Sequence, residues 1–272
     1  MKRVLRADFF ELRKSKSALV LPAVSVLLGL LMPLMYFGIV KLFEFVSDME
    51  ALQDESSIAS LKAMISMFTG RVVFLSSLQM SQGAGLLITA IVGFRAVRPF
   101  GTGIYRNKVI AQIPRSAIYL SQSLNSLLLT MVSAALYTVT LALMTRVTFG
   151  PLDFTGREIL SMTLLLFGIY LAYTAIPVYT AFLTRSVPLT ILVSLLMPIL
   201  GQTIVSFASP ALMTAPEAVM NALSILPSVQ GIYLSGANPS DTVLTISLIS
   251  DVVIAAGLTA LGIVRFKRTD LN

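Results

Sequence analysis

The sequence holds few side chains that could carry out catalytic chemistry. It contains no His and no Cys, which excludes thiol nucleophiles, disulfides, haem ligation by His and the usual zinc sites. The Gly101–Gly103 stretch lacks the lysine and the preceding strand of a phosphate-binding loop. Most acidic residues fall in segments expected to face the outer solvent, where a solvated surface explains them. We therefore predict that the chain is not an enzyme, holds no metal and needs a partner to bind ATP.

Among the polar side chains that lie within long apolar stretches, six are candidates for a functional role: Ser76, Gln79, Gln82, Asn125, Gln202 and Asp251. An acid at the centre of a membrane helix costs about 2.5–3.5 kcal/mol, so Asp251 should face protein or water. Ser76, Gln79 and Gln82 recur at i, i+3 and i+6 and share one helix face, where amides can bond across an interface. The six residues predict either the wall of a translocation path or a packing contact, including one between two copies of the chain.

Membrane-spanning helices must position these residues. Of the 272 residues, 56% are apolar and 12% are charged, about half of the roughly 25% charged that is usual in soluble domains. A bilayer core of about 30 Å requires about 20 apolar residues of helix. The apolar stretches predict six spans in one all-α polytopic membrane domain over residues 1–272, and they cover residues 18–40, 72–94, 118–145, 159–183, 187–206 and 242–264.

The distribution of Lys and Arg predicts the orientation. If both termini are cytoplasmic, 15 of the 20 Lys and Arg residues lie on that side, as positively charged inner loops require. Orientation therefore explains the net charge of +7, and no nucleic-acid partner is predicted. The first span is longer than the roughly 7–15 residues of a signal-peptide core, so we expect it to be retained in the cell membrane.

Residues 1–17 predict a helix that lies along the membrane surface. Leu5, Phe9 and Leu12 recur at i, i+4 and i+7, which places them on one helix face. Such a helix would contact the acyl boundary with this face and anionic lipid headgroups with its cations. The alternative is a basic flank that only sets the topology.

The segment between the second and third spans predicts a short cytoplasmic helix. Pro99, Gly101 and Gly103 are expected to end the helix of the second span. Thr102 would then cap a new helix, which should end before Pro114. The new helix carries Arg106, Asn107 and Lys108. It is either a solvated loop element or a lever that docks on another protein.

Short helices are also predicted on the outer side. Apolar residues at helical spacing predict one in the first outer loop: Ile58, Leu61, Ile65 and Phe68. Between the fifth and sixth spans, Thr214 and Glu217 have the spacing of a capping box for a helix that ends before Pro227. This second segment predicts a re-entrant or cap-like helix pair over the outer end of the bundle.

Two motifs and the layout of the chain resemble a known family. The first motif comprises Gly103, Arg106, Asn107, Lys108, Ile110 and Arg115, and the second comprises Phe266, Arg268, Asp270 and Leu271. With the basic amphipathic start and six spans, they resemble ABC-2 type exporter permeases, especially small bacterial ones associated with antimicrobial-peptide export and self-protection. Arg95 and Arg98 stand where that family commonly has an acidic residue.

The resemblance implies a transmembrane permease subunit that exports amphipathic or antimicrobial peptides, or alternatively drugs or lipids, from a bacterial cell. It implies that residues 1–17 form the elbow helix and that the helix after Gly103 couples to an ATPase. The implied coupling residues are Ile104, Tyr105, Arg106, Asn107, Lys108 and Val109. A complete transporter would also need two ATPase subunits, which bind ATP and Mg, and a second permease copy or a sister permease.

Two other kinds of protein remain compatible with the sequence. A secondary carrier driven by ions or protons commonly places charges near the midplane of the membrane. Asp251 is the candidate for such a charge. A membrane sensor subunit that transports nothing is the other. No residue identifies the cargo.

Overall fold

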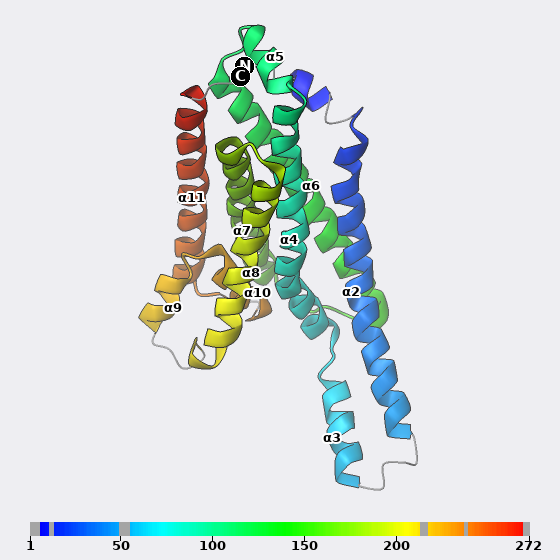
Figure 1. The fold of residues 1–272 in the computed structure, drawn as a ribbon. Helices are drawn as coiled ribbons and strands as arrows, with labels where there is room; N and C mark the ends of the chain where they lie inside the picture. Colours follow the sequence, from blue (N-terminus) through cyan, green and yellow to red (C-terminus); the bar gives the residue numbers. More distant parts are fainter. Residues whose placement is uncertain (1–5, 11–13, 49–54, 213–216, 237–238, 269–272) are drawn as a thin grey trace.

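The computed structural model describes residues 6–10, 14–48, 55–212, 217–236 and 239–268. Every regular element in these ranges is a helix (Figure 1). The long helices are α2 (Lys16–Asp48), α4 (Gly70–Gly101), α6 (Arg115–Phe149), α7 (Gly156–Thr184), α8 (Val187–Leu212) and α11 (Asp241–Lys267). The short ones are α3 (Glu55–Ser66), α5 (Ile104–Ile110), α9 (Glu217–Leu223) and α10 (Pro227–Gly236). The all-α prediction is confirmed, and each predicted span falls inside one long helix.

Four helices are long and apolar enough to cross a membrane. They are residues Ala18–Ser47 of α2 and the whole of α6, α7 and α11. A fifth crossing is possible if the end of α3 and the start of α4, which meet at a bend of 69°, count as one broken span. Within the described residues α8 adds a shorter apolar helix, Val187–Leu196. These helices are what a multi-pass membrane protein requires.

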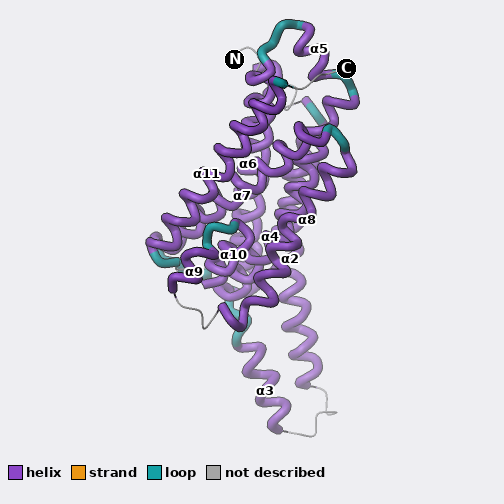
Figure 2. The backbone as a smooth tube through the Cα atoms, turned by 60° about the vertical axis from the view of Figure 1, so that its left-hand side comes forward, coloured by secondary structure: helices purple, strands orange, loops and turns teal. Residues whose placement is uncertain are grey.

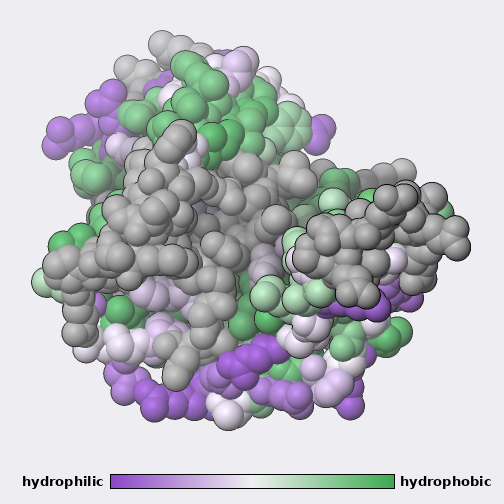
Figure 3. Space-filling view, turned by 90° about the horizontal axis from the view of Figure 1, so that it is seen from below, coloured by the Kyte–Doolittle hydropathy of each residue, from purple (hydrophilic) through white to green (hydrophobic). Residues whose placement is uncertain are grey.

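Helix α7 lies at the centre of the bundle and packs against α4, α6, α8, α10 and α11. Half of the residues in its apolar stretch are buried, compared with 28% of those in the apolar stretches of α2, α6 and α11. These three helices expose large apolar side chains on their outer faces, among them Leu27, Leu128 and Val253. In the view from the end opposite α5, hydrophobic side chains also reach the surface between hydrophilic ones (Figure 3). Such an outer surface suits contact with lipid.

The charge-rich segments that the orientation prediction placed on one side do lie at one end of the bundle (Figure 1). Lys108 of α5 pairs with Asp8 at 2.7 Å, and Arg115 donates to the carbonyl oxygens of Phe266 and Lys267 at 3.3 and 3.0 Å. The basic residues with described side chains here are Arg6, Lys14, Arg95, Arg98, Arg106, Lys108, Arg115, Arg185, Arg265, Lys267 and Arg268. In the part of the chain that the structure covers, Asp8 is their one acidic neighbour.

The break between α4 and α5 lies later than the sequence predicted. Helix α4 continues through Pro99, although proline has no N–H to donate to the preceding turn, and it ends two residues later at Gly101. The prediction that Thr102 caps α5 was wrong: Thr102 has helical dihedral angles and ends α4, with its N–H bonded to Arg98. An N-cap needs extended backbone to aim its side chain at the helix. Gly103 makes the turn instead, at a φ of 72° that favours glycine.

The predicted helices on the side opposite α5 are present, and the packing of one of them distinguishes between the re-entrant and cap-like alternatives. The helix before Pro227 ends at Leu223, as expected, whereas Thr214 of the predicted capping box falls outside the described residues. Helix α10 packs against α4, α7 and α8, and its Gln230 and Leu234 are fully buried. It is therefore part of the bundle. Helix α3 runs beside the end of α2, away from the other helices (Figures 1 and 2).

Candidate functional site

Helix α5 is fixed to the bundle by a cluster of aromatic rings. Tyr105 is 1% exposed, and its hydroxyl donates to the carbonyl oxygen of Ala96 at 3.1 Å. Its ring lies 4.7 Å from that of Phe100, 5.1 Å from Phe182 and 6.2 Å from Phe266. Aromatic pairs at such distances contribute about 0.5–1.5 kcal/mol each beyond the burial of their surface. The cluster therefore joins α5 firmly to α4, α7 and α11.

The opposite face of α5 points away from the bundle. Arg106 and Asn107 are exposed, and Ile110 is 70% exposed. Ile104 and Val109 are half-buried. Of the six residues implied to couple to an ATPase, only Arg106 and Asn107 therefore have an open side chain. Ile110, which was not among the six, extends the same surface with an apolar side chain.

Lys108 is engaged within the chain. Its ammonium group pairs with one carboxylate oxygen of Asp8 at 2.7 Å, and the hydroxyl of Ser121 donates to the other at 2.6 Å. The side chains of Lys108 and Asp8 are 20% and 11% exposed, so water screens this pair less than a surface pair. The contact holds residues 6–10 against α5 and α6. An acid within a basic segment is the one sequence feature that indicates a partner here, and it does not identify Lys108.

The predicted amphipathic face of residues 1–17 is seen only in part. Residues 6–10 are helical, and Phe9 is 51% exposed, as a residue that contacts lipid would be. Leu5 and Leu12 lie outside the described residues. The surface position of this helix stays a prediction.

Asp251 faces protein, as expected from the free-energy cost of exposing an acidic side chain to lipid. It is fully buried, and its Oδ1 accepts a hydrogen bond of 3.2 Å from the side-chain amide of Gln230. The same amide donates to the carbonyl oxygen of Ser224 at 3.0 Å, and Ser247 reaches that oxygen at 3.4 Å. Gly168 of α7 packs on the carboxylate, where a Cβ would overlap Oδ2. Asp251 is thus the centre of a buried contact between α7, α10 and α11.

Among the other polar residues predicted within spans, Ser76 and Asn125 have described side chains, and Asn125 lies apart from Asp251. Ser76 and Asn125 are half-buried, and Asn125 lines a cavity beside α5, whereas Asp251 is bonded to Gln230 of α10. The side chains of Gln79, Gln82 and Gln202 lie outside those that the structure describes. The structure therefore places Asn125 and Asp251 in separate environments.

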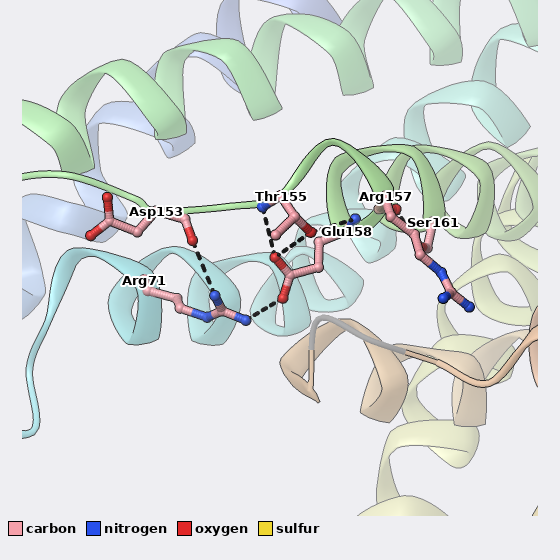
Figure 4. A network of polar contacts seen from close by, with 6 residues as sticks. All are labelled: Arg71, Asp153, Thr155, Arg157, Glu158 and Ser161. Carbon is pink, nitrogen blue, oxygen red and sulfur yellow. Dashed lines mark hydrogen bonds and ion pairs between the residues drawn. The ribbon is translucent and has the colours of Figure 1, made fainter.

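At the end of the bundle opposite α5, a cluster of polar side chains joins α4 to α7 (Figure 4). The guanidinium of Arg71 donates to the carboxylate of Glu158 and, at 3.1 Å, to the carbonyl oxygen of Asp153. Glu158 also accepts from the backbone and hydroxyl of Thr155 at 2.8 and 2.9 Å, which completes a capping box. The Thr-x-x-Glu spacing predicts that cap from sequence, but nothing local identifies Arg71 as its partner.

Replacing Arg71 by Gln is expected to lower the melting temperature measured in detergent, because the substitution leaves Glu158 without its cationic partner. Arg157→Gln is the matched control. Arg157 pairs with Asp241 at 2.8 Å, but their side chains are 67% and 83% exposed, and such surface pairs contribute little. Equal shifts for the two variants would contradict a structural role for the Arg71 cluster.

No model of a known protein family matches this chain, and no curated protein matches its sequence. Fold and contacts alone therefore define the class of the protein. It is an all-helical chain with at least four helices that can cross a membrane, and its described residues include a short helix, α5, held on one end of the bundle. Any finer statement of what it does is a proposal.

Proposed function

We propose that this chain is the membrane-spanning permease subunit of an ATP-driven exporter of the ABC-2 type. The observation that carries the proposal is α5: a short helix between α4 and α6 whose inner residue Tyr105 is buried while Arg106 and Asn107 stay exposed. A lever that receives force from another protein needs both features, a fixed inner face and an open outer one.

The aromatic cluster supports this role because it gives α5 a stiff connection to several helices at once. Tyr105 contacts rings on α4, α7 and α11, and Phe182 of α7 in turn contacts Tyr119 of α6 at 4.7 Å. A displacement of α5 would move the ends of these four helices together, since packed interiors transmit strain. A separate ATPase would bind ATP and Mg and carry out the hydrolysis.

The proposed assembly contains two permeases and two ATPases. Helices α4 and α8, of 32 and 26 residues, run alongside the four membrane-crossing helices (Figures 1 and 2) and would complete six spans. The concentration of basic residues at the α5 end supports a cytoplasmic position for that end, and we propose that the protein lies in the plasma membrane of a bacterial cell with both termini in the cytoplasm. The second permease is a copy of this chain or a sister permease.

We propose amphipathic peptides as the cargo, on the basis of the sequence resemblance to small peptide-exporting permeases. The interior of the bundle is apolar with scattered hydroxyls, such as the buried Thr130 and Ser133 of α6, and such an environment would also suit drugs or lipids. Transport assays with a fluorescent amphipathic peptide, a lipid analogue and a hydrophobic dye separate these alternatives.

Arg106→Glu is expected to reduce ATP-driven export several-fold in inverted vesicles that also contain the partner ATPase. The substitution reverses a charge on the open face of α5, where Arg106 is exposed and forms no ion pair with a described residue, so insertion and melting temperature should stay unchanged. Arg268→Glu, at the end of α11, is the control with the same charge change at the same end. Undiminished export by the Arg106 variant would contradict the lever.

A secondary carrier is the second candidate, and the buried Asp251 is the observation that favours it. Carriers driven by protons or ions place acidic groups within the membrane. Purified chain in vesicles, without any ATPase, provides the test. Uptake driven by a proton gradient alone would favour the carrier and overturn the exporter, whereas uptake that requires both the ATPase and ATP would overturn the carrier. Cargo binding without uptake under either condition would indicate a sensor.

A further inference from the structure

A cavity of about 320 Å³ lies beside α5. Its walls are the described N-terminal residues, the end of α4, α5 itself and the first turns of α6. The side chains that matter for its chemistry are Arg95, Arg98, Lys108, Gln122, Asn125 and Ser126. Three of these are cations and three are neutral hydrogen-bonding groups, so the cavity is built to receive an anion that also accepts hydrogen bonds.

The charge of the cavity is positive even after its own acid is counted. Asp8 also lines it, but Lys108 and Ser121 already occupy both carboxylate oxygens of Asp8. The positive charge of Arg98 therefore remains in excess over the acid. Arg98 is exposed, and no ion pair between described residues involves it.

The level of the cavity along the bundle matches that of lipid headgroups. Helix α6 has 35 residues, which at 1.5 Å per residue is about 52 Å, whereas the hydrocarbon core measures about 30 Å. The first turns of α6, where Gln122 and Asn125 lie, therefore fall near the edge of the core. Phe94 lines the same cavity and is 40% exposed, so an apolar side chain stands beside the cationic ones.

We propose that this cavity binds the phosphate group of an anionic phospholipid whose acyl chains run past Phe94. Basic pockets between membrane helices on the cytoplasmic side recognise such headgroups, and Arg binds phosphate through two parallel hydrogen bonds. The bound lipid would join α4, α5 and α6 at the end where Lys108 already holds Asp8. This inference does not depend on the proposed transport function.

The test uses the full chain in nanodiscs of phosphatidylcholine, alone or mixed with phosphatidylglycerol. Native mass spectrometry should find phosphatidylglycerol retained on the released protein, and the anionic lipid should raise the melting temperature. Arg98→Gln should weaken retention about ten-fold, as expected for the loss of one charge-assisted contact. Arg268→Gln is the matched control, because Arg268 is exposed at the same end and does not line the cavity.

A second variant separates a specific site from general attraction to charge. Asn125→Leu adds apolar bulk to the cavity and leaves every cation in place, so it should also reduce retention. Equal retention by wild type, Arg98→Gln and Asn125→Leu would overturn the proposal. Inorganic phosphate added to pure phosphatidylcholine nanodiscs should not stabilise the protein. Stabilisation by phosphate that Arg98→Gln abolishes would identify free phosphate as the ligand and exclude the lipid.

Discussion

Gly262→Leu is expected to lower the melting temperature of the detergent-solubilised protein by on the order of 10 °C, equivalent to about 3 kcal/mol of overpacking. Gly262 is a buried residue of α11, and a Cβ at this position would overlap the ring of Tyr119 on α6. That ring cannot move aside easily. It is 1% exposed, it packs 4.7 Å from Phe182, and its hydroxyl donates to Leu258 at 3.4 Å.

Gly257→Leu is the control for helix propensity and added apolar bulk. Gly257 belongs to the same helix, and a Cβ there has no neighbouring atom within 4 Å, so this variant should be as stable as wild type or slightly more so. Adding Tyr119→Ala to Gly262→Leu removes the overlapping ring. The double variant should therefore lose less stability than the sum of the losses in the two single variants. Equal melting temperatures for the two leucine variants would show that Gly262 is not a close contact.

The long helices could be predicted from sequence because their signal is local. A run of about 20 apolar residues without charge has few alternatives to a membrane helix, and every predicted span lies inside an observed helix. The ends were less accurate, since the sequence placed the start of the first span at Ala18 and its end at Val40, whereas α2 covers Lys16–Asp48. Polar residues near the ends of α2 extend the helix without extending the apolar run.

The contacts that position α5 could not be predicted, because they join segments far apart in the sequence. Asp8 and Lys108 are 100 positions apart, and no periodicity connects them. The resemblance to exporter permeases likewise grouped Tyr105 with Arg106 and Asn107 as coupling residues. The structure divides the group, because Tyr105 turns inward to Phe182 while Arg106 and Asn107 are exposed. Which face of a seven-residue helix is buried depends on its neighbours.

The position of α10 shows the same limit. A short segment broken by prolines is compatible with a helix over the bundle or a helix inside it, and only the packing decides. Gln230 was not among the predicted polar residues, yet it is fully buried and is the described hydrogen-bond donor to Asp251. The free-energy argument that Asp251 must face protein was correct, and it implies that some such partner exists without identifying it.

Gln230→Met is expected to destabilise the protein by about 3 kcal/mol, because it leaves the fully buried Asp251 without the amide that donates to it. Met has nearly the length of Gln, so the change removes a hydrogen bond and leaves little empty volume. Asp241→Asn is the control for loss of an acid on α11. Asp241 is 83% exposed, and its variant should melt close to wild type.

The double variant Gln230→Met/Asp251→Ala tests whether the two side chains act as a pair. Removing both polar groups from a buried contact costs less than removing one, since no group is left unsatisfied. Alanine also fits against Gly168, where the carboxylate now packs. The double variant should therefore be more stable than Gln230→Met alone by about 1 kcal/mol or more, measured by thermal unfolding in one detergent. Strictly additive losses would mean that Gln230 and Asp251 contribute independently, contrary to the hydrogen bond between them.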